Sequence, residues 1–192
     1  MGILKERFAS KFETVSTEIK EIIKEHGNKK IGEVSLSQVY QGMRGITGLV
    51  TETSLLDSQE GIRFRGYTIP ELQEKLPKAP NGTEPLPEGL LYLMLIGNLP
   101  TAEDVQHVTN VLQRRSHVPS HVFATIEALP ISSHPMTQFV VGIMALQTES
   151  EFAKKYAKGM SKKDYWEATF DDAMILLARL PRIAAYIYRR KY

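Results

Sequence analysis

The sequence predicts an all-α protein built from many helices, with one small β-ribbon. Apolar residues recur every three or four positions along most of the 192 residues, as they do on helices that pack by one face. Serine, threonine or proline stands near the start of most of these segments, which is typical of helix N-termini. The helical spacing is lost between Gly42 and Gly66, where glycines separate short apolar pieces, so turns and a β-ribbon are expected there.

The N-terminal part begins with a long amphipathic helix. Apolar residues from Leu4 to Ile23 lie mostly three or four positions apart, which predicts a helix over residues 4–25 that ends at His26 and Gly27. Ser35 is expected to begin a short helix over Leu36–Tyr40. Short strand-like pieces are then expected at residues 49–50, 55–56 and 62–64.

The chain after Tyr67 is expected to be helical apart from a loop at residues 77–87. Pro70 suits the first turn of one helix, and Thr101 and Ser120 are the predicted caps of two others. The last helix is expected to kink at Pro181, and its end at residue 192 resembles a cut more than a natural terminus. The later helices are expected at residues 87–96, 101–115, 120–129, 135–147, 151–158 and 163–192.

Composition argues against several classes of function. The chain has 24 basic and 22 acidic residues, so it lacks the basic excess expected of a nucleic-acid-binding protein. No stretch approaches the roughly 18 apolar residues of a membrane span. Without cysteine there can be no disulfide and no thiolate metal site. His117 and His121 are four residues apart, but Pro119 prevents a shared helical face, so no metal site is expected.

Arg44 is the first candidate for ligand contact, because it lies between two glycines in a predicted turn. An arginine held there can bind a carboxylate or phosphate, or it can form a structural ion pair, and the residues alone leave both open. Arg63 and Arg65 alternate along the predicted strand. They are expected to be structural and to pair with acids such as Asp57 or Glu60.

Two helices are apolar on nearly all sides, near residues 88–98 and 134–148. Such helices belong either to a deep core or to a subunit interface. His134 is expected to begin the second of them rather than to act in catalysis. The basic residues 189–191 are expected to form a solvated helix end.

Several blocks together resemble the citrate synthase family in its eukaryotic organellar form. They are Gly-Met-Arg-Gly at 42–45, Leu-Leu-Asp at 55–57 and Gly-Ile-Arg-Phe-Arg-Gly-Tyr-Thr-Ile-Pro-Glu at 61–71, with further agreement at 84–90 and 134–136. The resemblance extends from Leu4 to Tyr192. It implies that residues 1–192 are the N-terminal part of the family's helical large domain, without the small domain and the catalytic C-terminal half.

The resemblance implies an acyltransferase of the tricarboxylic acid cycle, which condenses acetyl-CoA with oxaloacetate to give citrate and CoA. Acetyl-CoA is then a substrate, and no tightly bound cofactor or metal is expected. The family's catalytic histidines and aspartate, and its oxaloacetate arginines, lie beyond the position of Tyr192. No catalytic residue can therefore be assigned, and the 192-residue chain alone is expected to be inactive.

Two candidate CoA contacts follow from the resemblance. Arg44 matches an arginine that contacts the phosphates of CoA. Lys162 stands where animal members have an arginine that serves the CoA nucleotide from the other subunit, and Lys163 could take its place. The resemblance also favours a homodimer through the two apolar helices, and the mitochondrial matrix as location, with the peroxisome as alternative.

Two other functions stay open on the sequence. A 2-methylcitrate synthase, which uses propionyl-CoA, would share these residues. A half-length paralogue could instead keep the dimer helices and act as a non-catalytic interaction subunit. A reading frame that continues past Tyr192 would reject this second alternative.

Overall fold

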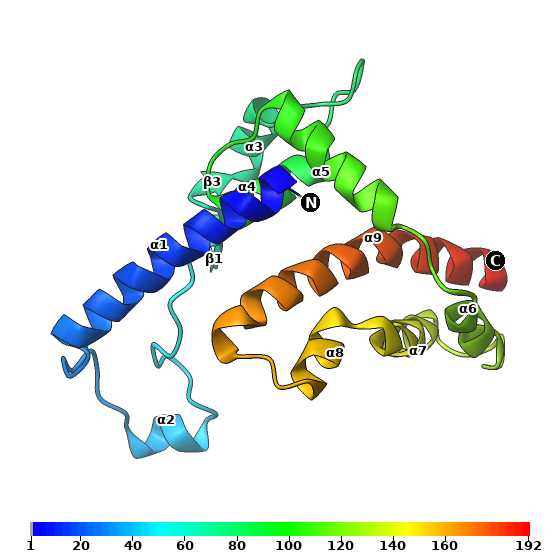
Figure 1. Cartoon of the computed structure of the whole chain (residues 1–192). Coiled ribbons are helices and arrows are strands. Elements are labelled where there is room, and N and C mark those ends of the chain that lie inside the picture. The colour runs from blue at the N-terminus through cyan, green and yellow to red at the C-terminus, as the bar shows by residue number, and fades with distance from the viewer. Residues whose placement is uncertain (1) are drawn as a thin grey trace. The chain divides into compact units, whose positions relative to one another are not determined.

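The computed structural model describes residues 2–192, which form helices joined by loops and one small sheet (Figure 1). The predicted all-α architecture is confirmed. The chain divides into two compact units, up to Gln106 and from His107 onward, and each is described by itself. The described helices are α1 (Gly2–His26), α2 (Leu36–Tyr40), α3 (Ile69–Lys75), α4 (Pro87–Ile96), α5 (Ala102–Arg115), α6 (Ser120–Glu127), α7 (Pro135–Leu146), α8 (Glu151–Ala157) and α9 (Tyr165–Lys191), with 3₁₀ turns η1 (Gln147–Glu149) and η2 (Lys162–Asp164).

The β-ribbon of the N-terminal unit is an antiparallel sheet of three strands, in the order β1 (Ser54–Asp57), β2 (Gly61–Phe64) and β3 (Tyr67–Thr68). Arg65 was expected to continue the strand, but it lies in the turn between β2 and β3. Arg65 and Gly66 have φ of 47° and 88°, the paired positive values of a two-residue hairpin turn. The short strand expected at residues 49–50 is absent from the described structure, where both residues are exposed and unpaired with any strand.

The core of the N-terminal unit lies where the sheet, α3 and α4 meet. Leu72 of α3 and Leu76, which caps its end, pack against Leu93 of α4, which is fully buried, and Phe64 and Tyr67 of the hairpin cover them. Leu4, near the start of α1, is the one buried residue of this helix within the described chain.

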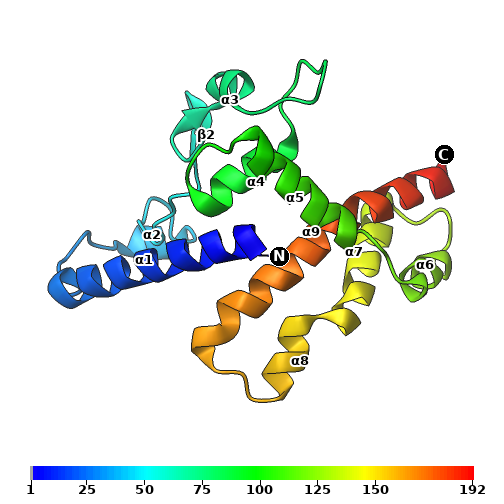
Figure 2. The same ribbon diagram turned by 45° about the horizontal axis from the view of Figure 1, so that its top comes forward.

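The C-terminal unit is built around α9, beside which α7 and α8 lie in both views (Figures 1 and 2). Its core joins α6, α7 and α9 through Val122, Ile126, Leu146, Ile183 and Ile187. Pro181 lies within α9, which continues as one helix to Lys191. No described helix is both long and apolar enough to cross a lipid bilayer.

Most of the predicted helix starts are confirmed by hydrogen bonds. Ser35 forms a capping box with Gln38, and Thr101 forms the equivalent pair with Asp104, whose carboxylate accepts from the Thr101 N–H at 3.0 Å. The prediction for Ser120 is wrong, since Ser120 is the first helical residue and Pro119 precedes it with no side-chain cap. The cap position belongs to the residue before the helix, here Pro119, so the hydroxyl of the helical Ser120 does not cap α6.

Candidate functional site

Arg44 lies in a tight turn directly after α2. Gly42, Met43 and Gly45 all have positive φ, between 63° and 76°, so the chain reverses sharply around the arginine. Gln38 braces this turn by two hydrogen bonds. Its side-chain amide donates to the Arg44 carbonyl at 3.2 Å, and its backbone carbonyl accepts from the Met43 N–H at 2.8 Å. The predicted turn is confirmed, and it holds the Arg44 backbone while its side chain remains exposed.

The other arginines of the N-terminal unit have protein partners. Arg63 forms an ion pair with Glu60 at 3.0 Å, which confirms its predicted structural role. Arg65 donates to the carbonyl of Met94 at 2.7 Å and lies 3.6 Å from the Glu52 carboxylate, so its role is structural but its acid differs from those predicted. Asp57 serves the hairpin instead: its carboxylate accepts the N–H groups of Glu60 and Gln59, which lowers its pKa.

Arg7 was not singled out by its sequence. It reaches from α1 to the Tyr92 hydroxyl of α4 and to the Asp104 carboxylate at the start of α5. Among residues 2–106, Arg44 is thus the one arginine for which no ion pair or side-chain hydrogen bond to protein is seen. This leaves its guanidinium available to an external anion.

Lys162 begins η2, the 3₁₀ turn that leads into α9, and its side chain is exposed. Neither Lys162 nor its neighbour Lys163 forms an ion pair within the described residues. Both positions can therefore present a cation to solvent, as the resemblance requires. Arg44 belongs to the N-terminal unit and Lys162 to the C-terminal unit.

The histidines have structural surroundings in the C-terminal unit. The Nδ1 atom of His134 accepts the Met136 N–H at 3.1 Å, which confirms that His134 begins α7. His121 Nε2 lies 3.1 Å from the Ala145 carbonyl, and His117 precedes α6, so the two do not share a helix face. Residues 2–192 contain no group of three or more metal-binding side chains placed to hold an ion.

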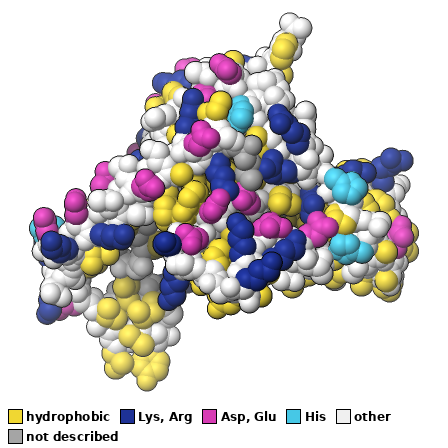
Figure 3. Space-filling view, in the orientation of Figure 1, with side chains coloured by type: hydrophobic (Ala, Val, Ile, Leu, Met, Phe, Trp, Pro, Cys, Tyr) yellow, Lys and Arg dark blue, Asp and Glu magenta, His cyan; other side chains and the backbone are white. Residues whose placement is uncertain are grey.

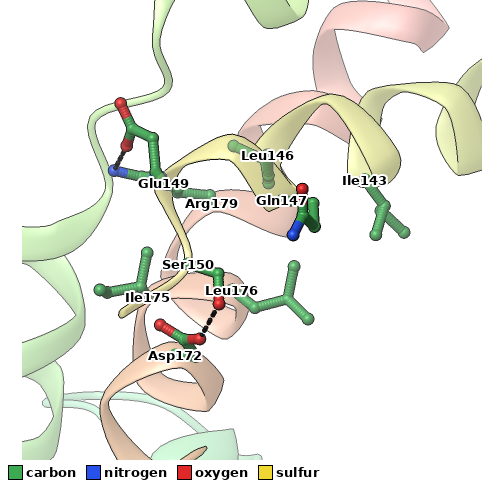
Figure 4. A pocket seen from close by; sticks show the side chains of 9 residues that line it. All are labelled: Ile143, Leu146, Gln147, Glu149, Ser150, Asp172, Ile175, Leu176 and Arg179. Carbon is green, nitrogen blue, oxygen red and sulfur yellow. Dashed lines mark hydrogen bonds and ion pairs between the residues drawn. The ribbon is translucent and has the colours of Figure 1, made fainter. Parts of the chain in front are cut away.

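A pocket between α7 and α9 has a largely apolar lining, with Ile143, Leu176 and Ile175 among its residues (Figure 4). Two polar links lie within it. Arg179 pairs with Glu149 at 2.9 Å, and the Ser150 hydroxyl donates to Asp172 at 2.5 Å. The Asp172 carboxylate also accepts the N–H groups of Glu151 and Phe152. Asp172 therefore caps the start of α8 although it lies in α9. These links hold η1 and α8 against α9.

Arg190 overturns the expectation of a solvated basic end at residues 189–191. It donates to the side-chain oxygen of Gln138 at 2.7 Å and to the Leu129 carbonyl at 2.5 Å, with a longer bond to the Glu127 carbonyl. Gln138 is fully buried, so it needs partners inside the protein. A lone glutamine in an apolar helix was the one signal in the sequence that could have pointed to this link.

The two apolar helices differ in exposure. None of the large apolar side chains of α4 is exposed, and Leu93 lies in the core, so for α4 the structure favours the core alternative. The helix α7 also has a buried face, but Met136, Val140 and Met144 are exposed at four-residue intervals. This outer stripe of α7 is an apolar surface that the described chain leaves uncovered.

The fold is similar to that of solved citrate synthases. Among solved structures, citrate synthase from Pyrobaculum aerophilum superposes with a TM-score of 0.64 at 23% identity, over 85% of this chain and 40% of that one. The ternary complex of the Thermoplasma acidophilum enzyme with carboxymethyl coenzyme A and oxaloacetate gives 0.60 at 19%, over 79% and 35%. The chain therefore has the helical fold of citrate synthases.

Sequence comparison then defines the family. The family model for the C-terminal domain of citrate synthase matches residues 42–192, and the chain belongs to the citrate synthase family. It is 56% identical to the mitochondrial citrate synthase of Daucus carota, over 91% of this chain and 37% of the relative. Identity to the mitochondrial enzyme of Saccharomyces cerevisiae is 53%, over 98% and 40%. The chain thus spans about two fifths of the length of these relatives.

Proposed function

We propose that this chain is the CoA-contacting and dimer-forming portion of a citrate synthase, which condenses acetyl-CoA with oxaloacetate to give citrate and CoA. The observation that carries the proposal is identity above 50% to enzymes of that name across nearly the whole chain. Within these 192 residues no side chain can be assigned the family's catalytic roles. The chain alone should therefore bind CoA without turning it over.

Arg44 is the proposed contact for the phosphates of CoA. Its support is the braced glycine turn and the absence of a protein partner for its guanidinium among the described residues. A guanidinium fork matches two phosphate oxygens, so it binds them more strongly than a single ammonium would. Lys162 is the second proposed contact, at the nucleotide end and from the other subunit.

A homodimer is proposed to form through α7, whereas α4, the other helix expected at the interface, has no exposed large apolar side chain. The support is the stripe of Met136, Val140 and Met144, which a second copy would cover. Replacing Val140 by glutamate should give a monomer in analytical ultracentrifugation. Ala124→Glu on the exposed side of α6 is the matched control and should leave the dimer intact. A dimer that survives Val140→Glu would remove α7 from the interface.

A chimera tests the activity. The segment of the Saccharomyces cerevisiae mitochondrial citrate synthase that aligns with this chain is replaced by the chain itself. Oxaloacetate-dependent release of the CoA thiol from acetyl-CoA is the expected result. A folded, dimeric chimera with no thiol release would contradict the proposal.

The same chimera tests Arg44. Arg44→Gln should raise the KM for acetyl-CoA about tenfold and leave kcat nearly unchanged, because it removes binding that ground and transition states share. Arg114→Gln, at an exposed position of α5, is the control for loss of one positive charge. Equal effects of the two substitutions would show that only net charge matters.

A 2-methylcitrate synthase is the second candidate, because the mitochondrial enzyme of that name from Yarrowia lipolytica is 51% identical over 98% of this chain. Turnover of propionyl-CoA in preference to acetyl-CoA by the natural protein would favour it. The mitochondrial matrix is the proposed location, from the names of the most similar relatives, although a peroxisomal relative is 49% identical. Fractionation of the natural source decides between these compartments.

A further inference from the structure

A dense lysine cluster surrounds the junction of α8 and α9. Five lysines occur between residues 154 and 163. Lys154 is neutralised by Glu151, whose carboxylate lies 3.0 Å from its ammonium group. The other four, at positions 155, 158, 162 and 163, form no ion pair or side-chain hydrogen bond within residues 2–192. Unpaired like charges at such short spacing repel one another, and a bound anion would relieve this repulsion.

Two of these lysines line a hollow on the surface of the C-terminal unit. Lys155 and Lys158 line it together with Gly159 and Met160, and the hollow has a volume of about 350 Å³. This volume lies within the range of roughly 300–1,000 Å³ usual for small-molecule sites. The hollow is also lined by two acidic residues, Asp164 at the end of η2 and Glu167 in the first turn of α9.

Hydrogen bonds fix the backbone that carries Lys155 and Lys158. The Met160 N–H donates to the Lys155 carbonyl at 3.1 Å, and the Gly159 N–H donates to the Tyr156 carbonyl at 2.9 Å. Gly159 has φ of 82°, which closes α8 in the left-handed conformation that glycine favours. The hollow therefore has a preformed edge, and only the lysine side chains need to be ordered by a ligand.

We infer that this hollow is an additional phosphate subsite for a nucleotide, in which Lys155 and Lys158 bind phosphate. The two carboxylates that line the same hollow repel a bare phosphate, but they can accept hydrogen bonds from ribose hydroxyls or an amino group on the base. The hollow therefore favours a phosphorylated nucleoside over inorganic phosphate or pyrophosphate.

The inference rests on the proposed function, because Lys162, the proposed contact for the CoA nucleotide, lies four residues beyond Lys158. Lysine lacks the two-pronged donor geometry of the arginine found at this position in animal members. The ammonium groups of Lys155 and Lys158 would add positive charge to the weaker contact that Lys162 makes alone. The lysine cluster then selects the phosphorylated nucleotide end of CoA.

Calorimetric titration of the 192-residue chain with adenosine 3′,5′-bisphosphate, the nucleotide portion of CoA, tests the subsite. Lys155→Gln with Lys158→Gln should weaken binding about tenfold. Lys154→Gln is the matched control, since it removes a positive charge from the same helix at a position already paired with Glu151. It should change the affinity less than twofold. In the unmodified chain, inorganic pyrophosphate should bind more weakly than the bisphosphate nucleotide.

The possible outcomes separate the inference from the proposed function. Equal affinities for the double variant and for Lys154→Gln would overturn the subsite, and so would equal binding of pyrophosphate. If Lys162→Gln alone weakens nucleotide binding, the subsite is wrong while the proposed CoA contact survives. If the double variant weakens nucleotide binding but Arg44→Gln and Lys162→Gln leave CoA binding unchanged, the subsite survives without those contacts. No nucleotide binding by the folded chain would overturn both.

Discussion

Arg190 joins α9 to the ends of α6 and α7, and replacing it by methionine should destabilise the C-terminal unit strongly. The substitution removes the donor to the side-chain oxygen of Gln138, and Gln138 is 0% exposed, so water cannot replace that donor. An unsatisfied buried acceptor costs about 1–3 kcal/mol, and the loss of donors to the Glu127 and Leu129 carbonyls adds up to roughly 1 kcal/mol. We therefore expect the free energy of unfolding to fall by about 2–4 kcal/mol.

A double-mutant cycle separates the lost bond from lost packing. Gln138→Met alone should also destabilise the protein, because it removes the donor to the Ser133 carbonyl as well as the acceptor for Arg190. The double variant has no buried amide left unpaired, so its cost should be smaller than the sum of the single costs by about 1–2 kcal/mol. Urea denaturation followed by far-UV circular dichroism measures all four proteins.

The neighbouring Arg189 supplies the control. It is exposed and carries the same charge, so Arg189→Met should change the free energy of unfolding by less than about 0.5 kcal/mol. If Arg190→Met were no more destabilising than this, the three hydrogen bonds would contribute nothing to stability. Strictly additive costs in the cycle would show that Arg190 and Gln138 act independently.

Three further outcomes are expected from the structure. Thr101→Ala should lower the free energy of unfolding by about 1 kcal/mol, measured by urea denaturation, because it removes the hydroxyl that pairs with Asp104 at the start of α5. Burial alone would raise the pKa of Asp104, but hydrogen bonds from Thr101 and Arg7 outweigh it and hold the pKa below its ordinary value. Its contribution is therefore complete above about pH 5 and is lost as pH falls through the lowered pKa, so Asp104→Asn should flatten the acid limb of stability measured from pH 5 to 2. Gly142→Val should cost about 1–3 kcal/mol, since even a Cβ there would lie 2.9 Å from Ile126, whereas Gly48→Val, with open space around it, should change the melting temperature little.

Helix boundaries could be predicted wherever the capping groups are close in sequence. Ser35, Thr101 and His134 each bond within three residues of themselves, so residue type and spacing were sufficient to identify them. The cap of α8 shows the limit. Ser150 supplies one local bond, but Asp172 supplies two more from α9, and only the packing of the two helices brings it there.

Strand assignment failed for a related reason. The apolar pair at residues 49–50 has the composition of a strand, but a strand needs a hydrogen-bonded neighbour and these exposed residues have none in the described sheet. The prediction that Arg65 continues the strand was wrong for another reason. The two-residue hairpin turn takes up Arg65 and Gly66, both with positive φ. Alternation in sequence gives no sign of where a strand must reverse.

The same distinction between local and long-range structure applies to the candidate site. The Arg44 turn could be predicted because Gly42 and Gly45 lie within two residues of the arginine, whereas the bracing Gln38 lies in the preceding helix and was not identified. The lysine hollow could not be predicted, since its lining residues come from α8, the turn after it, η2 and α9, and only the fold brings these together. Of its lysine cluster, only Lys162 and Lys163 were singled out from the sequence.

Apolar residues left exposed in the N-terminal unit bear on how the whole protein is assembled. Leu36, Val39 and Tyr40 of α2 are all more than half exposed, and hydrophobic side chains gather over this helix at the lower left of Figure 3. Surfaces of this kind on a soluble protein mark places that another protein surface covers. Since α2 leads directly into the Arg44 turn, whatever covers α2 would also fix the position of that turn. The affinity of Arg44 for a phosphate should therefore depend on assembly as well as on its own charge, because a turn that is already ordered loses less conformational entropy when it binds.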